Sequence, residues 1–300
     1  MNANEKEVIK KEYALSDNEF EEMYQQAKTL IIGKCKPAKE TPMAIITGGQ
    51  PGAGKIGLVL KSKREMKEKG KDTVIIDSDS YRGLYKRSIE IAARYPELYS
   101  EITDRATGKI TNRLLNEVID GGYNFIFEGI LGKINIVNSL QNAPREYEVT
   151  ARLIATSKEE SLLSIFERYI VMLKNMQIGR LTTIEAHNTR YDNFTNIAKI
   201  LEDRGIETEV YERGKDIEHI GYPKMIYKTS ANNNMYKTVE DALNAGRIRS
   251  FKLCESNIKT RLKEINNSLR NLSYKNPEIK EELEKLNEIF SQITINDEER

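Results

Sequence analysis

The sequence of 300 residues lacks several features that define whole classes of protein. It has no charge excess, because 47 Lys and Arg are balanced by 46 Asp and Glu, so its composition does not indicate a nucleic-acid or anionic-membrane partner. No apolar run is long enough to span a bilayer, and the charged N-terminus lacks the hydrophobic stretch of a secretory signal. We therefore expect a soluble cytoplasmic protein.

Cysteine and histidine are also scarce. Cys35 and Cys254 are isolated from each other and from both histidines, which argues against a disulfide framework and a metal knuckle. We interpret the two cysteines as ordinary thiols. His187 is open to two interpretations, a pocket residue or a packed helix residue, and we favour packing. His219, in a charged segment, carries no functional signal.

The chain does contain an alternation of short apolar runs and longer helical patterns. Six runs predict buried strands, at residues 43–48, 72–77, 123–129, 148–155, 206–211 and 224–229. Helical patterns lie between most of them, which is typical of a mostly parallel α/β sheet with helices on both faces. The short connection before the last run favours a terminal hairpin. Ser16 is a candidate N-cap for a leading helix at 17–32.

The strand signal ends near residue 236. We therefore predict an α/β core at residues 1–235, including the leading helix, and a helical C-terminal extension at 236–300. In the extension an αα-hairpin, broken at Asn276-Pro277, is predicted by apolar residues at helical spacing, which are Ile258, Leu262, Ile265, Leu269, Leu272, Ile279, Leu283, Leu286 and Phe290. The hairpin is either a packing appendage of the core or an arm for a partner or for oligomerisation.

A phosphate-binding loop is predicted directly after the first run. The segment Gly49-Gln50-Pro51-Gly52-Ala53-Gly54-Lys55 satisfies the pattern G-x-x-x-x-G-K between a strand and a helix. Its glycines let backbone N–H groups converge on phosphates, and its lysine reaches the β- and γ-phosphates of a nucleotide. The loop therefore predicts that the core at residues 1–235 is P-loop kinase-like. The next residue, where Ser or Thr normally binds Mg²⁺, is Ile56, so water, phosphates and carboxylates must hold the metal. Without a ligand, the segment is only a glycine-rich turn.

Three acids follow strand ends, at the edge of the sheet where open α/β folds bind ligands. After the second run come Asp77 and Asp79, of which one could orient Mg²⁺-bound water and the other accept a proton from an attacking hydroxyl. We assign an indirect metal role to Asp77. The alternative for Asp79 is a helix N-cap. Glu128 follows the third run and is either a site residue or a solvated strand end.

Two arginines could clamp a transferring phosphoryl group. Arg168 lies late in a helical segment, and Arg180 lies in the polar connection after it. A guanidinium is planar and permanently charged, which suits the charge that spreads over the γ-phosphoryl oxygens in the transition state. Taken alone, each arginine is more simply interpreted as a surface salt-bridge partner.

The ordered set of motifs resembles the zeta toxin family, the kinase half of bacterial toxin–antitoxin pairs. The resemblance covers most of the chain and depends on GGQPGAGK, IIDSDS, GYN followed by three apolar residues and EG, ERY, GRLTTIEAHN and a helical tail with an N-P-E break. It implies ATP-dependent phosphorylation of the 3′-hydroxyl of UDP-N-acetylglucosamine and a small helical antitoxin as partner. In two places the sequence departs from the family: Ile56 replaces the magnesium-binding hydroxyl, and Ile130, followed by LGK, replaces a threonine and an arginine-containing turn.

The resemblance also implies roles for individual residues. Lys55 binds the nucleotide, Asp79 is the catalytic base and Glu128 contacts the substrate. Arg168 and Arg180 clamp the phosphate. Two other hypotheses remain beside the sugar-nucleotide kinase: a kinase for another small-molecule hydroxyl, and a degenerate P-loop protein that binds nucleotide or a protein partner without turnover. Ile56 favours the degenerate P-loop protein, whereas the retained Asp79, Arg168 and Arg180 favour the two kinase hypotheses.

Overall fold

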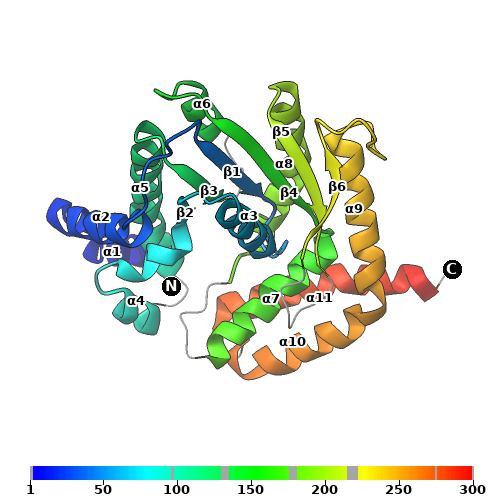
Figure 1. The fold of residues 1–300 in the computed structure, drawn as a ribbon. Helices are drawn as coiled ribbons and strands as arrows, with labels where there is room; N and C mark the ends of the chain where they lie inside the picture. Colours follow the sequence, from blue (N-terminus) through cyan, green and yellow to red (C-terminus); the bar gives the residue numbers. More distant parts are fainter. Residues whose placement is uncertain are drawn as a thin grey trace.

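The computed structural model describes residues 3–95, 98–129, 135–175, 181–214, 222–273 and 276–298. Its centre is a six-stranded sheet with the strand order β2-β3-β1-β4-β5-β6 (Figure 1). The strands are β1 (Met43–Gly48), β2 (Thr73–Asp77), β3 (Asn124–Glu128), β4 (Glu148–Ala155), β5 (Glu207–Glu212) and β6 (Lys224–Lys228). The first five are parallel and β6 is antiparallel to β5, which confirms the predicted sheet and terminal hairpin.

Helices connect the strands and extend beyond them. They are α1 (Ala3–Glu12), α2 (Asp17–Ile31), α3 (Ile56–Glu68), α4 (Ser88–Arg94), α5 (Tyr99–Asp120), α6 (Asn135–Gln141), α7 (Lys158–Lys174), α8 (Ile184–Asp203), α9 (Val239–Cys254), α10 (Ile258–Ser273) and α11 (Pro277–Glu298), with the 3₁₀ turns η1 (Ser78–Leu84) and η2 (Glu255–Asn257). Ser16 caps α2 in a reciprocal capping box with Glu19, as predicted. The hydroxyls of Ser157 and Thr183 cap α7 and α8 by accepting the backbone N–H groups of Glu160 and Ala186.

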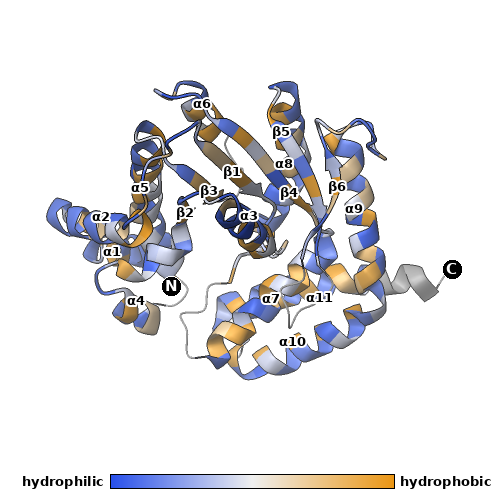
Figure 2. Cartoon of the chain, viewed as in Figure 1, coloured by the Kyte–Doolittle hydropathy of each residue, from blue (hydrophilic) through white to orange (hydrophobic). Residues whose placement is uncertain are grey.

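Side chains alternate between the two faces of the sheet, and both faces are covered. In β1, Ala44 and Ile46 pack into the main core with residues of α5, α8 and α9. Met43 and Ile45 point the other way and pack against Val59 of α3. Figure 2 shows that β1, β3 and β4 carry much hydrophobic colour, whereas the visible sides of α1 and α2 are mostly hydrophilic. Because helices cover both faces of the sheet, the alternating side chains are apolar in both directions, and the central strands therefore appear in the sequence as continuous apolar runs.

The C-terminal helices have two different neighbours. Helix α9 packs on the sheet, where a Cβ at Gly246 would lie 2.6 Å from the Cβ of Ala155. Helices α10 and α11 form the predicted αα-hairpin, in which α10 packs on α7 and α11 contacts α8. The boundary between residues 235 and 236 stays a prediction, although α9 adheres to the sheet beyond it. In the part of the chain described here, each helix is too short or too polar to cross a membrane.

Candidate active site

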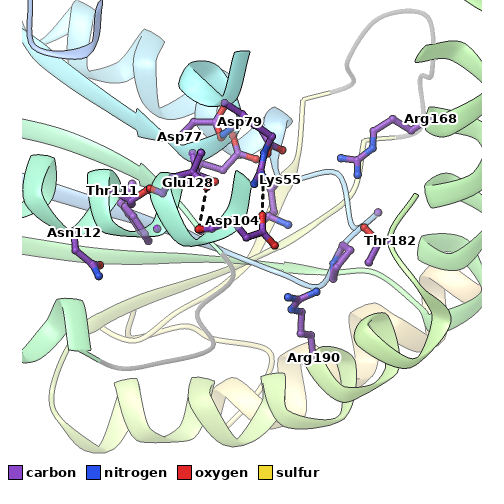
Figure 3. Close-up of a pocket in the computed structure, with 18 residues that line it drawn as sticks. Lys55, Asp77, Asp79, Asp104, Thr111, Asn112, Glu128, Arg168, Thr182 and Arg190 are labelled. Atoms are coloured by element: carbon purple, nitrogen blue, oxygen red, sulfur yellow. Dashed lines mark hydrogen bonds and ion pairs between the residues drawn. The ribbon is translucent and has the colours of Figure 1, made fainter. Parts of the chain in front are cut away.

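A cavity of about 390 Å³ opens at the carboxyl ends of the parallel strands, and Figure 3 shows its lining. Its walls come from the loop after β1, from η1 and α5, from the end of β3, and from α7 and α8. The lining residues are Pro51, Gly52, Lys55, Asp77, Ser78, Asp79, Arg82, Asp104, Thr107, Gly108, Thr111, Asn112, Phe127, Glu128, Gly129, Arg168, Thr182 and Arg190. The cavity therefore lies where open α/β sheets bind ligands.

The phosphate loop needs glycine at two positions. Gly52 and Gly54 have φ angles of 75° and 90°, in the left-handed region that side chains rarely adopt. A Cβ on Gly52 would also lie 2.1 Å from the carbonyl oxygen of Ser161 on α7. The loop is thus pressed against α7, and its path into the N-terminus of α3 is that of a phosphate cradle.

Lys55 lines the cavity at the start of α3. Its Nζ donates to the carbonyl oxygens of Gly49 and Gln50, at 3.1 and 3.2 Å, so the side chain folds back on its own loop. Burial lowers the pKa of Lys55 to about 8, against the opposing charge of Glu128. An anion bound in the cavity would stabilise the charged ammonium that burial has desolvated, so the buried lysine favours the binding of phosphate.

The strand register brings the acids together. Asp77 of β2 is the direct partner of Glu128 of β3. Burial, and next the charge of Asp77, raise the pKa of Glu128. Asp77 is the N-cap of η1, because its Oδ1 accepts the backbone N–H of Asp79 at 3.0 Å and its Oδ2 accepts the Ser80 hydroxyl at 2.9 Å. The capping role considered for Asp79 is therefore filled by Asp77, and Asp79 is left facing the cavity.

Asp79 is held at the cavity by a buried arginine. Arg82 Nε lies 3.3 Å from Asp79 Oδ1, and Arg82 Nη1 lies 2.6 Å from Asp104 Oδ1 on α5. Arg82 Nη1 also donates to the Thr103 hydroxyl at 2.6 Å. The Asp79 side chain stays 58% exposed, so its carboxylate is accessible to a substrate hydroxyl.

Cationic side chains approach from the other wall. Arg168 of α7 and Arg190 of α8 line the cavity, and in Figure 3 they come from helices separate from the strand ends that carry Asp77 and Glu128. The positive charges of both arginines lower the pKa of Lys55. The same charges attract anions to the cavity.

A family model described as "Zeta toxin" matches residues 28–221, which is more than half of the chain. The chain belongs to the zeta toxin family. Toxin PezT of Streptococcus pneumoniae serotype 4 is 30% identical over 206 residues, covering 67% of this chain and 79% of PezT. Toxin zeta of Enterococcus hirae is 25% identical over 201 residues, covering 66% of this chain and 68% of that toxin.

A solved structure confirms the likeness in three dimensions. A chain from the PezAT chromosomal toxin–antitoxin system of Streptococcus pneumoniae superposes with a TM-score of 0.64 at 25% identity, and the match covers 84% of this chain and 98% of that one. The resemblance inferred from the motifs is therefore confirmed, as is the kinase-like α/β fold. Zeta toxins are kinase-like toxins, and this member carries their architecture.

The cavity gathers most of the residues that the zeta toxin motifs singled out. Lys55, Asp77, Asp79, Glu128 and Arg168 all line it, although their roles stay predictions. Two predicted residues stand apart. Ile56 is not among the lining residues, and it is 48% exposed at the start of α3. Arg180 lies outside the described residues, as does the altered position Ile130.

Sequence reasoning missed several lining residues of this zeta toxin. Arg82, Asp104 and Arg190 form part of its charged wall, and Thr111 and Asn112 add polar groups. A signal existed for some of them. Polar or small residues recur along α5 at positions 104, 107, 108 and 111, the spacing of one helix face, and Arg190 lies three residues after His187 on α8. The spacing predicts a shared face, but only the fold shows that this face borders the site.

Behind the phosphate loop lies a buried chain of polar groups. Gln50 Nε2 donates to Ser161 Oγ at 3.2 Å and to the Thr156 carbonyl oxygen at 2.8 Å. Ser161 Oγ lies 2.8 Å from His187 Nε2, and His187 Nδ1 lies 3.0 Å from Asn188 Oδ1. His187 is fully buried, in agreement with its interpretation as a packed residue. It also supports the loop through Ser161.

This buried histidine predicts a pH-dependent stability. Burial lowers the pKa of His187 from 6.5 to about 4. The unfolded chain binds a proton on this residue as the pH falls below its ordinary pKa, and the folded chain does so only near the lowered pKa. The contribution of His187 to stability should therefore fall by up to about 3 kcal/mol as the pH drops through this window, and stay level above it.

Urea unfolding at about pH 7 and about pH 5 tests this. The variant His187→Gln, which keeps a polar side chain, should lose most of the difference between the two pH values. A difference as large as in the parent protein would assign the pH dependence to other groups.

Proposed function

We propose that this zeta toxin is an ATP-dependent kinase that phosphorylates the 3′-hydroxyl of UDP-N-acetylglucosamine. The observation that carries the proposal is the cavity itself, where a phosphate-loop lysine, an accessible aspartate and arginines from two helices line one space. Lys55 and Arg168 supply positive charge, and Asp79 supplies a proton acceptor. Such a set matches the needs of phosphoryl transfer, which depends on positioning and electrostatic stabilisation.

In the proposed reaction Asp79 accepts the proton of the acceptor hydroxyl. The hydroxyl oxygen forms a bond to the γ-phosphorus of ATP, and the bond between that phosphorus and the bridging oxygen of ADP breaks. Lys55 and Arg168 neutralise charge on the phosphoryl oxygens, and Arg180 is proposed as a second clamp. Glu128 is proposed to contact the sugar nucleotide beside Asp79.

The described residues fit a phosphate chain better than they fit a metal ion. Lys55 hydrogen-bonds to loop carbonyls that a phosphate could replace, and Gly52 lines the cavity without a side chain. Ile56 offers no oxygen, and the described residues contain no group of three His, Cys, Asp or Glu poised to chelate a metal. Mg²⁺ bound with ATP would supply charge neutralisation at the phosphates, with Asp77 as the proposed contact through water.

The substitution Ile56→Thr tests the missing hydroxyl. It adds a hydroxyl next to Lys55, although Ile56 does not line the cavity in this structure. If that hydroxyl turns toward Mg²⁺ bound with ATP, turnover should rise and the Mg²⁺ concentration for half-maximal activity should fall, whereas a hydroxyl that stays on the exposed face of α3 leaves both unchanged. The fold should tolerate the change because both residues are β-branched and Ile56 is half-exposed. Leu60→Thr, one turn along the exposed face of α3, is the matched control. Identical magnesium titrations for parent and Ile56→Thr would show that the hydroxyl does not limit catalysis.

The most direct test of the function follows ADP formation by the wild-type chain with and without UDP-N-acetylglucosamine. We expect ADP formation that requires the sugar nucleotide and yields its 3′-phosphate. ATP binding without ADP formation would favour the non-catalytic alternative. Turnover with other hydroxyl compounds but not with this one would favour a kinase of different specificity.

We also propose an antitoxin partner. The matched solved structure belongs to a toxin–antitoxin system, and the likeness covers most of this chain. A small helical protein that binds the chain would keep its activity in check. Affinity purification from the native host tests this, and a chain recovered without a stoichiometric small protein counts against the proposal.

A further inference from the structure

The C-terminal hairpin is joined to α7 by a buried ion-pair cluster. Arg261 of α10, with a side chain only 10% exposed, grips Glu167 as a fork: its Nε lies 2.6 Å from Oε1 and its Nη2 lies 2.7 Å from Oε2. Its Nη1 lies 2.5 Å from Oε2 of Glu160, which precedes Glu167 by about two turns of α7. One guanidinium thus holds two carboxylates of α7, and Glu167 is the neighbour of Arg168.

The same cluster continues to the phosphate loop. Oε1 of Glu160 accepts a hydrogen bond of 2.9 Å from Nη1 of Arg213, which follows β5. That nitrogen also donates to the carbonyl oxygen of Gly52 at 3.3 Å. A Cβ on Gly54 would lie 3.3 Å from Arg213 Nε, so the arginine runs along the loop. Arg261, Glu160, Arg213 and Gly52 therefore form a continuous polar path from α10 to the phosphate cradle.

The hairpin also packs on α7 and on the start of α8. Ile265 and Leu269 of α10 and Leu286 of α11 share an apolar cluster with Phe166 of α7. The buried Glu282 of α11 accepts the backbone N–H of Ile184, the first residue of α8, at 2.7 Å. The hairpin thus contacts both α7, which carries Arg168, and α8, which carries Arg190.

We propose that Arg261 is a positioning residue through which the α10–α11 hairpin fixes the phosphate loop and the Arg168 helix. The proposal rests on the proposed kinase function. Two arginines balance two glutamates in the cluster, and Glu160 is only 13% exposed. Without Arg261, Glu160 loses a charge partner, and its carboxylate must turn toward water or toward Arg213. Either motion disturbs the contact of Arg213 with Gly52, because a partly buried charge does not stay unpaired.

The test is Arg261→Met in the full-length chain, with the Kd of ATP measured by calorimetry and the kinetics measured on the folded protein. Arg261→Met should raise the Kd of ATP about tenfold and lower kcat, while the KM of the acceptor stays near the wild-type value. A merely structural role would lower the melting temperature and leave both the Kd and kcat of folded molecules unchanged. Arg270→Met, on the exposed surface of the same helix, is the matched control and should match wild type.

A double-mutant cycle tests the path itself. Arg213→Met should also weaken ATP binding, and the effects of Arg213→Met and Arg261→Met should combine to less than their sum, because both act through Glu160. Strictly additive effects would show that Arg213 and Arg261 act independently, which would contradict the proposed coupling between α10 and the loop.

Further outcomes separate this inference from the proposed function. If the wild-type chain binds no ATP, the proposed function fails and the inference falls with it. If wild type binds ATP and folded Arg261→Met binds it equally well, the inference alone is overturned. Should Arg261→Met not fold, Arg261→Lys decides: lysine keeps the charge and lacks the fork, so a weakened Kd supports the proposal and a wild-type Kd overturns it.

Discussion

The substitution Asp79→Asn is expected to slow phosphoryl transfer by roughly 100-fold or more and to leave the Kd of ATP nearly unchanged. The amide has the shape of the carboxylate but cannot accept the proton of the attacking hydroxyl. Stability should change little, because the side chain is 58% exposed and contacts Arg82 at 3.3 Å without burying its charge. Steady-state kinetics and ATP calorimetry on one preparation measure the two quantities separately.

Asp104→Asn is the matched control for this prediction. Asp104 lines the same cavity and shares Arg82 with Asp79, so its substitution perturbs the same charge cluster without removing the proposed base. We expect a clearly smaller loss of kcat. Equal losses in the two variants, or a parallel loss of kcat and ATP affinity in Asp79→Asn, would contradict the assignment of Asp79.

The second large effect is expected for Lys55→Ala. Loss of the ammonium should weaken ATP binding at least about tenfold and abolish measurable turnover, because Lys55 is the loop side chain that can reach the β- and γ-phosphates. The lowered pKa of about 8 adds a pH dependence. In the wild-type protein, ATP affinity should fall as the pH rises above this value, because the free lysine then loses its charge.

Lys63→Ala, on the exposed surface of α3, controls for the loss of a lysine from the same helix. It should keep both wild-type affinity and its pH profile. A Lys55→Ala protein that binds ATP as tightly as wild type would show that the loop is a glycine-rich turn and no phosphate cradle.

The order of the elements was predictable from the chain alone. All six apolar runs became strands. For the first five the reason is that buried parallel strands need hydrophobic residues on both faces, a requirement that local sequence displays directly, whereas β6 is an antiparallel and largely exposed strand. The Ser16 cap and the break at Asn276-Pro277 were equally local, since capping and proline geometry depend on a few neighbouring residues. The motif order likewise sufficed to indicate the zeta toxin family.

The tertiary structure alone decided which charged residues share the site. Register between β2 and β3 sets Asp77 beside Glu128, and burial then raises the pKa of Glu128. Arg82 was no different from any surface arginine in the sequence, and it became a bridge between two acids only because α5 packs against η1.

The role of the C-terminal hairpin shows the same division. Its heptad-like spacing determined two amphipathic helices, because periodicity is a property of the local chain. Which surface they cover depends on long-range packing, and no short pattern encodes a contact between residues as far apart as Glu160 and Arg261. The sequence by itself thus determined the elements, the phosphate loop and the family, and the fold decided the composition of the cavity and the support behind it, because electrostatic environments arise only when distant segments exclude water together.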